Sequence, residues 1–185
     1  MDLLNKKEGW EIRTKRTRRR KFLEVVGILA AVVASIGGIA WYVATRPTAP
    51  PPPPGEIISE TGIHWHPQLT ITIKGEGQVI PGDIGMGMQF AGYPQYDPMM
   101  MMTDMHTHDD SGQLHWEIMK GPVTKDQVRL SNFFGIWGKT FTSSCIFTYC
   151  NGPQGHLTFK VNGKNNQDFE NYLVKDNDKI EIIFQ

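Results

Sequence analysis

The chain beyond residue 56 alternates apolar and polar side chains with a period of two, which is typical of half-buried β-strands. In Leu69–Lys74 every second residue is apolar, so the apolar side chains share one face of the predicted strand. Gly75-Glu76-Gly77 then permits a reversal into residues 78–80. This part of the chain therefore predicts a β-hairpin.

Three further segments repeat this alternation, and turn-forming residues stand beside two of them. The segments are residues 114–119, 156–162 and 179–184. Asn162-Gly163 and the run Lys175-Asp176-Asn177-Asp178 are the expected turns.

A short helix is expected between these strands. Ser131 is the expected N-cap, Phe133, Phe134 and Trp137 follow at helical spacing, and Gly138 is expected to end the helix. We expect the three aromatic side chains to pack in the core rather than to contact a ligand. The predicted fold is α+β, with a mainly antiparallel or mixed sheet and one short packed helix.

The N-terminal part follows another pattern, because Val25–Ala44 is apolar or small throughout, apart from Ser35. Twenty such residues in a helix span about 30 Å, the thickness of the hydrocarbon core of a bilayer. Trp41, Tyr42 and Arg46 are typical anchors at a membrane interface. We therefore expect a single transmembrane helix.

Charge predicts the orientation of this helix. The chain has 19 basic and 19 acidic residues, but residues 1–46 hold ten Lys and Arg against four acidic residues. Seven of the nine residues in Arg13–Lys21 are basic. By the positive-inside rule this flank stays in the cytoplasm and the rest of the chain lies outside. The cluster also suits nucleic-acid phosphates, but its position directly before the apolar span favours the topological interpretation, so no nucleic-acid partner is expected.

A cleaved signal peptide is the alternative to an uncleaved anchor, since Gly38-Ile39-Ala40 offers small residues to a signal peptidase. The apolar stretch is longer than a typical signal-peptide core, which favours a signal-anchor. Pro47 and Pro50–Pro54, followed by Gly55, then predict a stiff polyproline II spacer. The expected organisation is a basic cytoplasmic segment (1–21), a transmembrane signal-anchor in the lipid bilayer (22–46), a proline-rich linker (47–55) and an extracytoplasmic domain (56–185).

Five of the six histidines fall within 52 residues of that domain, in the motifs HWHP, MHTHDD and LHWE. Side chains alternate along an extended chain, so His64 and His66 point the same way, and so do His106 and His108. Each pair can offer two nitrogens to one ion. The sixth histidine, His156, is expected at the surface.

The third motif adds two more candidate ligands. In residues 114–119 the apolar side chains occupy the core face, which places His115 and Glu117 together on the opposite face. If the strands with the histidine pairs are neighbours, the imidazoles and this carboxylate converge on zinc or copper. In the alternative interpretation the histidines form hydrogen bonds with Asp104, Asp109 and Asp110 and titrate near neutral pH.

A methionine-rich run lies next to the second histidine pair, and it consists of Met99, Met100, Met101, Met102 and Met105. Thioethers are soft ligands that favour Cu(I), so these residues are candidate accessory ligands to copper. The alternative is a flexible hydrophobic loop that packs on the domain or on a partner.

The two cysteines, Cys145 and Cys150, have a CX4C spacing that differs from the CxxC of thioredoxin-type oxidoreductases. A structural disulfide is expected in an oxidising compartment, where it would contribute about 2 kcal/mol by the chain-entropy model. A redox role or thiolate ligation of a metal is the alternative.

A resemblance that extends over nearly all of residues 58–185 is carried by four segments, HWHPQLTITIKGEGQVIPGDIG, HTHDDSGQLHWE, LSNFFGIWGK and VNGKNNQDFENYLVKDNDKIEI. They resemble an uncharacterised family of small, mostly membrane-anchored envelope proteins of bacteria and archaea. The resemblance implies an envelope location and makes HxHP and HTHDxSGxxHxE the signature, but it supplies no activity. The Met-rich run looks like an addition to this pattern.

The C-terminal segments VNGK and LVKDNDKIEIIF resemble the end of a β-grasp domain of the sulfur-carrier kind. Those carriers act through a C-terminal Gly-Gly, whereas this chain ends in Phe184-Gln185. This resemblance therefore implies a β-grasp-like fold without the carrier activity.

Three functions are compatible with these features. The first is a membrane-anchored extracytoplasmic protein that binds copper or zinc through the clustered histidines, for storage, sensing or delivery. The second is a metal-dependent envelope enzyme in which Glu117 or Asp109 acts as general base. The third is a structural module whose polar face contacts an envelope protein or glycan partner.

Overall fold

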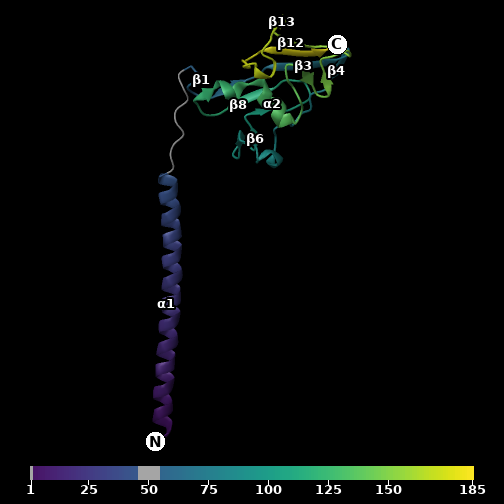
Figure 1. Cartoon of the computed structure of the whole chain (residues 1–185). Helices are drawn as coiled ribbons and strands as arrows, with labels where there is room; N and C mark the ends of the chain where they lie inside the picture. The colour runs from purple at the N-terminus through teal and green to yellow at the C-terminus, as the bar shows by residue number, and fades with distance from the viewer. Residues whose placement is uncertain (1, 46–54) are drawn as a thin grey trace. The chain divides into compact units, whose positions relative to one another are not determined.

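The computed structural model describes residues 2–45 and 55–185, with side chains from residue 18 onward (Figure 1). Internal contacts divide the chain into two units, Met1–Pro51 and Pro52–Gln185. Of the expected proline-rich linker at 47–55, residues 47–54 lie outside the described residues.

The first unit contains the long helix α1 (Asp2–Ala44). Its segment Arg18–Ala44 has a mean hydropathy of 2.3 over its most apolar stretch, and the side chains there are exposed. This segment is long and apolar enough to span a membrane. The helix also continues through the basic residues that precede the expected anchor.

The second unit is built around a five-stranded sheet (Figure 1). Its strands, in spatial order, are β13 (Lys164–Asn165), β12 (Leu157–Val161), β14 (Lys179–Phe184), β3 (Gln68–Ile73) and β4 (Glu76–Gln78). The central pair, β14 and β3, is parallel, and the other pairs are antiparallel. The parallel pair is formed by the first and last strands of the sheet and lies between β12 and β4, which is the expected β-grasp-like arrangement.

The alternation of apolar and polar side chains accounts for the packing of this sheet. In β3 and β14 every second side chain is buried in the core, as the sequence predicts. The hairpin between β12 and β13 turns at Asn162 and Gly163, whose φ angles of 51° and 75° lie in the left-handed region. Asn and Gly tolerate this region best, so the expected turn is confirmed.

Helix α2 (Leu130–Trp137) packs its buried aromatic residues into the same core. The Phe133 ring contacts Trp116, and the Phe134 ring contacts Phe141, which in turn contacts Phe159 on β12. Gly138 ends the helix in a left-handed conformation, as expected.

The predicted start of α2 is wrong by two residues. Arg129 is the N-cap residue and Ser131 lies inside the first turn, with no side-chain cap. The backbone N–H of Leu130 instead donates to the carbonyl of Tyr172, and that of Asn132 donates to the carbonyl of Arg129. The hydrogen bond to Tyr172 therefore provides the acceptor for a helix N-terminal N–H that a capping side chain would otherwise provide.

A second, three-stranded antiparallel sheet has the order β2 (Ile63–Trp65), β8 (His115–Ile118) and β7 (Met105–His106). Strand β2 lies directly before β3 in the sequence, while β7 and β8 lie in the connection between β4 and α2. The contact between Trp116 and Phe133 places one face of this sheet on the common core.

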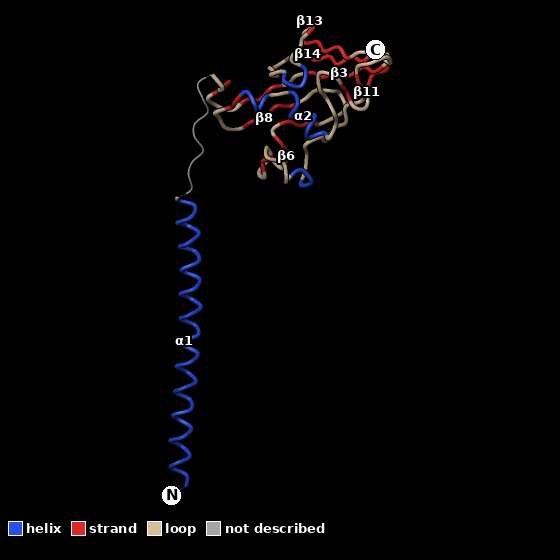
Figure 2. The backbone as a smooth tube through the Cα atoms, viewed as in Figure 1, coloured by secondary structure: helices blue, strands red, loops and turns tan. Residues whose placement is uncertain are grey.

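Short elements complete the domain, and loops join them (Figure 2). Three antiparallel pairs are β1 (Ile57–Ser59) with β9 (Val123–Thr124), β5 (Tyr96–Asp97) with β6 (Met102–Thr103), and β10 (Cys145–Ile146) with β11 (Tyr149–Cys150). Three 3₁₀ helices are η1 (Met88–Phe90), η2 (Lys125–Val128) and η3 (Phe169–Asn171).

Candidate metal centre

The three-stranded sheet brings the histidine motifs together. In β8 the side chains of Trp116 and Ile118 are buried in the core, so His115 and Glu117 lie on the opposite face. The register pairs His64 with Glu117 and His106 with His115. The expectation that these strands are neighbours is therefore confirmed.

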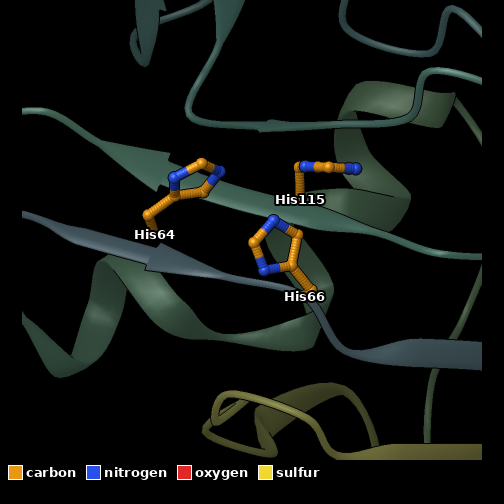
Figure 3. Close-up of side chains that lie close together, drawn as sticks. All are labelled: His64, His66 and His115. Carbon is orange, nitrogen blue, oxygen red and sulfur yellow. The ribbon is translucent and has the colours of Figure 1, made fainter.

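Five imidazoles form two overlapping groups. One group is His64, His66 and His115, and the other is His106, His108 and His115. Within each group, one nitrogen from each ring lies within 4.8 Å of the others. Figure 3 shows the first group, in which His64 and His66 come from the β2 segment and face His115 on β8. Each group offers three nitrogens at a spacing that small movements could adapt to one ion.

The hydrogen bonds of His106 define which of its nitrogens is free. Its Nδ1 lies 3.0 Å from the carbonyl oxygen of Thr103, which can only accept, so Nδ1 carries the proton and donates. The lone pair is then on Nε2. Metal-binding histidines commonly have this arrangement, in which a carbonyl fixes the tautomer and the ring orientation.

Two ring nitrogens are buried without hydrogen-bond partners among the described residues. They are Nε2 of His106 and Nδ1 of His115. Buried polar atoms in native proteins are nearly always satisfied, so two such atoms in one histidine cluster indicate a further partner. A metal ion is the partner that accepts imidazole lone pairs directly.

Burial favours the neutral form of two of the histidines, His106 and His115. Burial is the main cause, and together with His108 and His64 it lowers the pKa of His106 to about 4, against the opposing effect of the Thr103 hydrogen bond. Burial and the other four histidines lower the pKa of His115 to about 4 as well. Both rings are therefore unprotonated at neutral pH, which is the form that binds metals.

The second histidine pair is held in place by the residue between its members. Thr107 is fully buried, and its hydroxyl donates to the carbonyl of Pro81 and accepts from the backbone N–H of Ile84. His66 is tied through its backbone N–H, which donates to the carboxylate of Asp176 at 2.9 Å. The turn before β14 therefore helps to position the first pair.

The carboxylates near the histidines have different environments. Glu117 lies 3.9 Å from Nε2 of His64, measured from its Oε2 atom. Hydrogen bonds from Ser111 and the nearby histidines lower the pKa of Asp109. Burial, and then the charge of Asp97, raise the pKa of Asp104 to about 6. Of these three carboxylates, Glu117 is the one in ion-pair distance of a candidate ligand.

The methionines occupy two environments. Met102 and Met105 are buried, and Met105 is part of the core, whereas Met99, Met100 and Met101 are exposed. Met105 pairs with Trp116 on the core side of the sheet, and side chains alternate along β7. Its side chain and that of His106 therefore lie on opposite faces. Copper ligation by the methionines stays a prediction.

The cysteines form a disulfide, as expected. Cys145 and Cys150 are cross-strand neighbours on β10 and β11. Neither thiol is therefore free. His156, directly before β12, is exposed, also as expected. Neither cysteine belongs to the histidine groups.

Sequence reasoning found the ligand candidates but missed their supports. Thr103 acts through its backbone carbonyl, which any residue carries, so no sequence signal identifies it. Asp176 acts from a turn 110 residues away from His66. Such a contact can be recognised only from the folded structure.

Two cavities of the domain lie away from the clustered histidines. One of about 270 Å³ is lined by residues of the β3–β4 hairpin and by Asp110, Ser111 and Gly112. Another, of about 280 Å³, lies over the neighbouring ends of β3 and β14. None of the five clustered histidines lines either cavity.

Comparisons with known proteins provide no relative to which this centre can be compared. No family profile, no curated protein and no solved structure matches the chain.

Proposed function

We propose that this protein is a membrane-anchored, extracytoplasmic binder of copper or zinc. The observation that carries the proposal is the convergence of five histidines in which two buried ring nitrogens have no hydrogen-bond partner. The Thr103 carbonyl supports it, because a proton on Nδ1 of His106 leaves the lone pair on the unpartnered Nε2.

The donor set supports these two metals over others. Neutral imidazoles suit zinc and copper, whereas calcium and magnesium require oxygen ligands. Glu117 supplies one carboxylate beside His64. Because the cysteines form a disulfide, an iron–sulfur or thiolate zinc site is not supported.

Two features support the location. Arg18–Ala44 forms a helix long and apolar enough to cross a bilayer. A disulfide persists in an oxidising compartment outside the cytoplasm. With the basic flank in the cytoplasm, the helix would hold the metal-binding domain on the outer side of the membrane. Metal storage, sensing or delivery at the membrane are the uses that fit this placement.

A metal-dependent enzyme is the second candidate. Three histidines per group leave a fourth position open, as in catalytic zinc sites, and Glu117 is close enough to serve as a base. The two cavities beside β3 are lined by other residues, so neither of them is a substrate pocket at the histidines.

The test is the metal content of the full chain in detergent micelles, purified without a polyhistidine tag. After exposure to equimolar copper and zinc and removal of excess metal, mass spectrometry should find stoichiometric metal. The double variant His106→Ala/His108→Ala should lose at least half of it. His156→Ala is the matched control, since it removes a histidine outside the cluster, and it should retain the wild-type content.

A wild-type protein that retains no copper or zinc would contradict the proposal. The histidine face would then be better explained as a contact surface for an envelope partner, and cross-linking in membranes would be the next experiment.

A further inference from the structure

We infer that the cluster is a dinuclear site in which the imidazole of His115 bridges two metal ions. This inference rests on the proposed function and assigns the number of ions and their shared ligand. Its starting point is that, among the described residues, only His115 belongs to both histidine groups.

The position of His115 in the sheet supports this assignment. It lies on β8, the central strand, with His64 and His66 from the β2 side and His106 and His108 from the β7 side. Metal–nitrogen bonds are about 2 Å long, which limits two donors of one ion to about 4 Å. Among the described residues, no group of three candidate ligand atoms within 4.8 Å of one another contains a member of each pair. This grouping favours one ion for each pair.

The contacts between imidazole rings also separate the two histidine pairs. His115 contacts His66 and His64 at centroid distances of 4.8 and 6.3 Å. It contacts His108 and His106 at 4.5 and 5.3 Å. In the described residues, no ring contact joins a member of one pair to a member of the other. Among the described residues, His115 is therefore the ring that contacts both pairs.

An imidazole ring can serve both halves because its two nitrogens lie on different edges. Figure 3 shows one nitrogen of His115 on the side of His64 and His66, and the other directed away from both. The Nδ1 atom is buried and has no hydrogen-bond partner in the described residues.

The chemistry of the bridge is a ligand exchange without redox change. The first ion binds the unprotonated nitrogen of neutral His115. When the second ion binds, the remaining ring N–H loses its proton to the buffer, and the freed lone pair forms the new metal–nitrogen bond. Each ion then has three imidazole ligands and an open position for water or another small ligand.

The experiment is a Cu(II) titration of the full chain in detergent micelles, followed by metal analysis and electron paramagnetic resonance. We expect two equivalents of copper per chain. The resonance signal should grow with the first equivalent and weaken with the second, because an imidazolate bridge couples the two unpaired spins.

Variants separate the two halves. His64→Ala/His66→Ala and His106→Ala/His108→Ala should each bind one equivalent and give the full signal of an isolated ion. His115→Ala should lose the coupling at any loading, and His156→Ala should behave as wild type. Circular dichroism of each metal-free variant checks that the domain is folded.

Other outcomes overturn the inference in distinguishable ways. One equivalent that is lost in both double variants would show a single shared site, which keeps the proposed function. Two equivalents with uncoupled spins would disprove the bridge. No bound copper or zinc would overturn the proposed function as well.

Discussion

At the scale of single residues, Thr107 determines how the second histidine pair is presented. Its backbone N–H donates to Ile84, its carbonyl accepts from Asp83, and its hydroxyl bridges Pro81 and Ile84. These four hydrogen bonds fix the residue between His106 and His108. The pair is therefore held rigidly before any ion binds, which favours affinity because little order has to be gained on binding.

Replacing Thr107 by Val tests this support. Valine has a similar shape but leaves the Pro81 carbonyl and the Ile84 N–H without their partner, at a cost of about 1–3 kcal/mol of folding free energy. We expect metal affinity at this pair to fall by about tenfold, as for other supports of metal ligands. Competition with a chelator measures the affinity. Thr158→Val on β12, outside the histidine-bearing sheet, is the control, and equal affinities of the two variants would contradict the role of Thr107.

The buried histidines also predict how the metal-free protein responds to acid. His106 and His115 have pKa values of about 4 in the folded state, against 6.5 for an ordinary histidine. Between pH 6.5 and 4 the unfolded chain therefore binds protons that the folded cluster does not bind, so stability falls as the pH falls. Asp104 opposes this, because its raised pKa of about 6 makes the folded state take up a proton earlier than the unfolded state.

The two contributions can be separated by urea unfolding in the presence of a chelator at pH 7.5, 6 and 5. The wild type should lose stability over this range, and Asp104→Asn should lose it more steeply because the opposing group is gone. His106→Gln should have a shallower dependence. A wild-type stability that is constant or rises on acidification would show that the histidines are not held neutral by burial.

At the scale of elements, periodicity predicts which strands exist but not how they are combined. Residues 179–184 alternate along their whole length, and β14 has these same bounds. The helix end at Gly138 was predictable because a left-handed residue needs glycine. The start of α2 was not, since the partner of its first N–H is the carbonyl of Tyr172, which is distant in sequence.

For the candidate site too, local sequence patterns predict some features, whereas others depend on contacts between residues distant in sequence. The HxH spacing predicts that each pair shares a face, and the apolar pattern of residues 114–119 predicts the face of His115. That β8 lies between β2 and β7 depends on long-range pairing, which a single sequence does not encode locally. The sharing of His115 by two groups could therefore be recognised only from the fold.

The turn before β14 joins several elements through one carboxylate. Asp178 is buried and accepts hydrogen bonds from the Tyr172 hydroxyl, from Asn162 and from the backbone N–H of Lys175. Burial and the Asp178 charge raise the pKa of Tyr172, which therefore remains a donor. The carbonyl of Asp178 also accepts from Gln68 at the start of β3. Asp178 thus links the β12–β13 hairpin and the end of η3 through its carboxylate, and the parallel pair through its carbonyl.

Removing the Asp178 carboxylate should lower the stability of the domain. Asp178→Ala leaves three donors without their acceptor, and we expect a loss of about 3 kcal/mol or more in the free energy of unfolding. Tyr172→Phe removes one donor and should cost about 1–2 kcal/mol. Urea unfolding followed by tryptophan fluorescence measures both. If Tyr172→Phe were as destabilising as Asp178→Ala, the other two donors would contribute little and the network would be misassigned.

At the scale of the whole molecule, the orientation of the proposed membrane helix would determine on which side of the membrane the candidate metal centre lies. Positive charges near a membrane helix are retained in the cytoplasm, whereas acidic residues have little influence. The basic residues of Arg13–Lys21 should therefore hold the N-terminus inside. The Cys145–Cys150 disulfide then reports on the location of the domain, because it forms only in an oxidising compartment.

This relation yields a test in intact membranes. In the wild type, a thiol-reactive maleimide should label Cys145 and Cys150 only after denaturation and reduction. Replacing the seven basic residues of Arg13–Lys21 by Gln should leave a fraction of the chains inverted, and in these the cysteines should react without a reductant. Replacing the nearby acidic Glu8 and Glu11 by Gln should change nothing, since acidic residues do not set topology. Wild-type cysteines that react without reduction would place the domain in the cytoplasm, where the histidine cluster would encounter an intracellular metal pool.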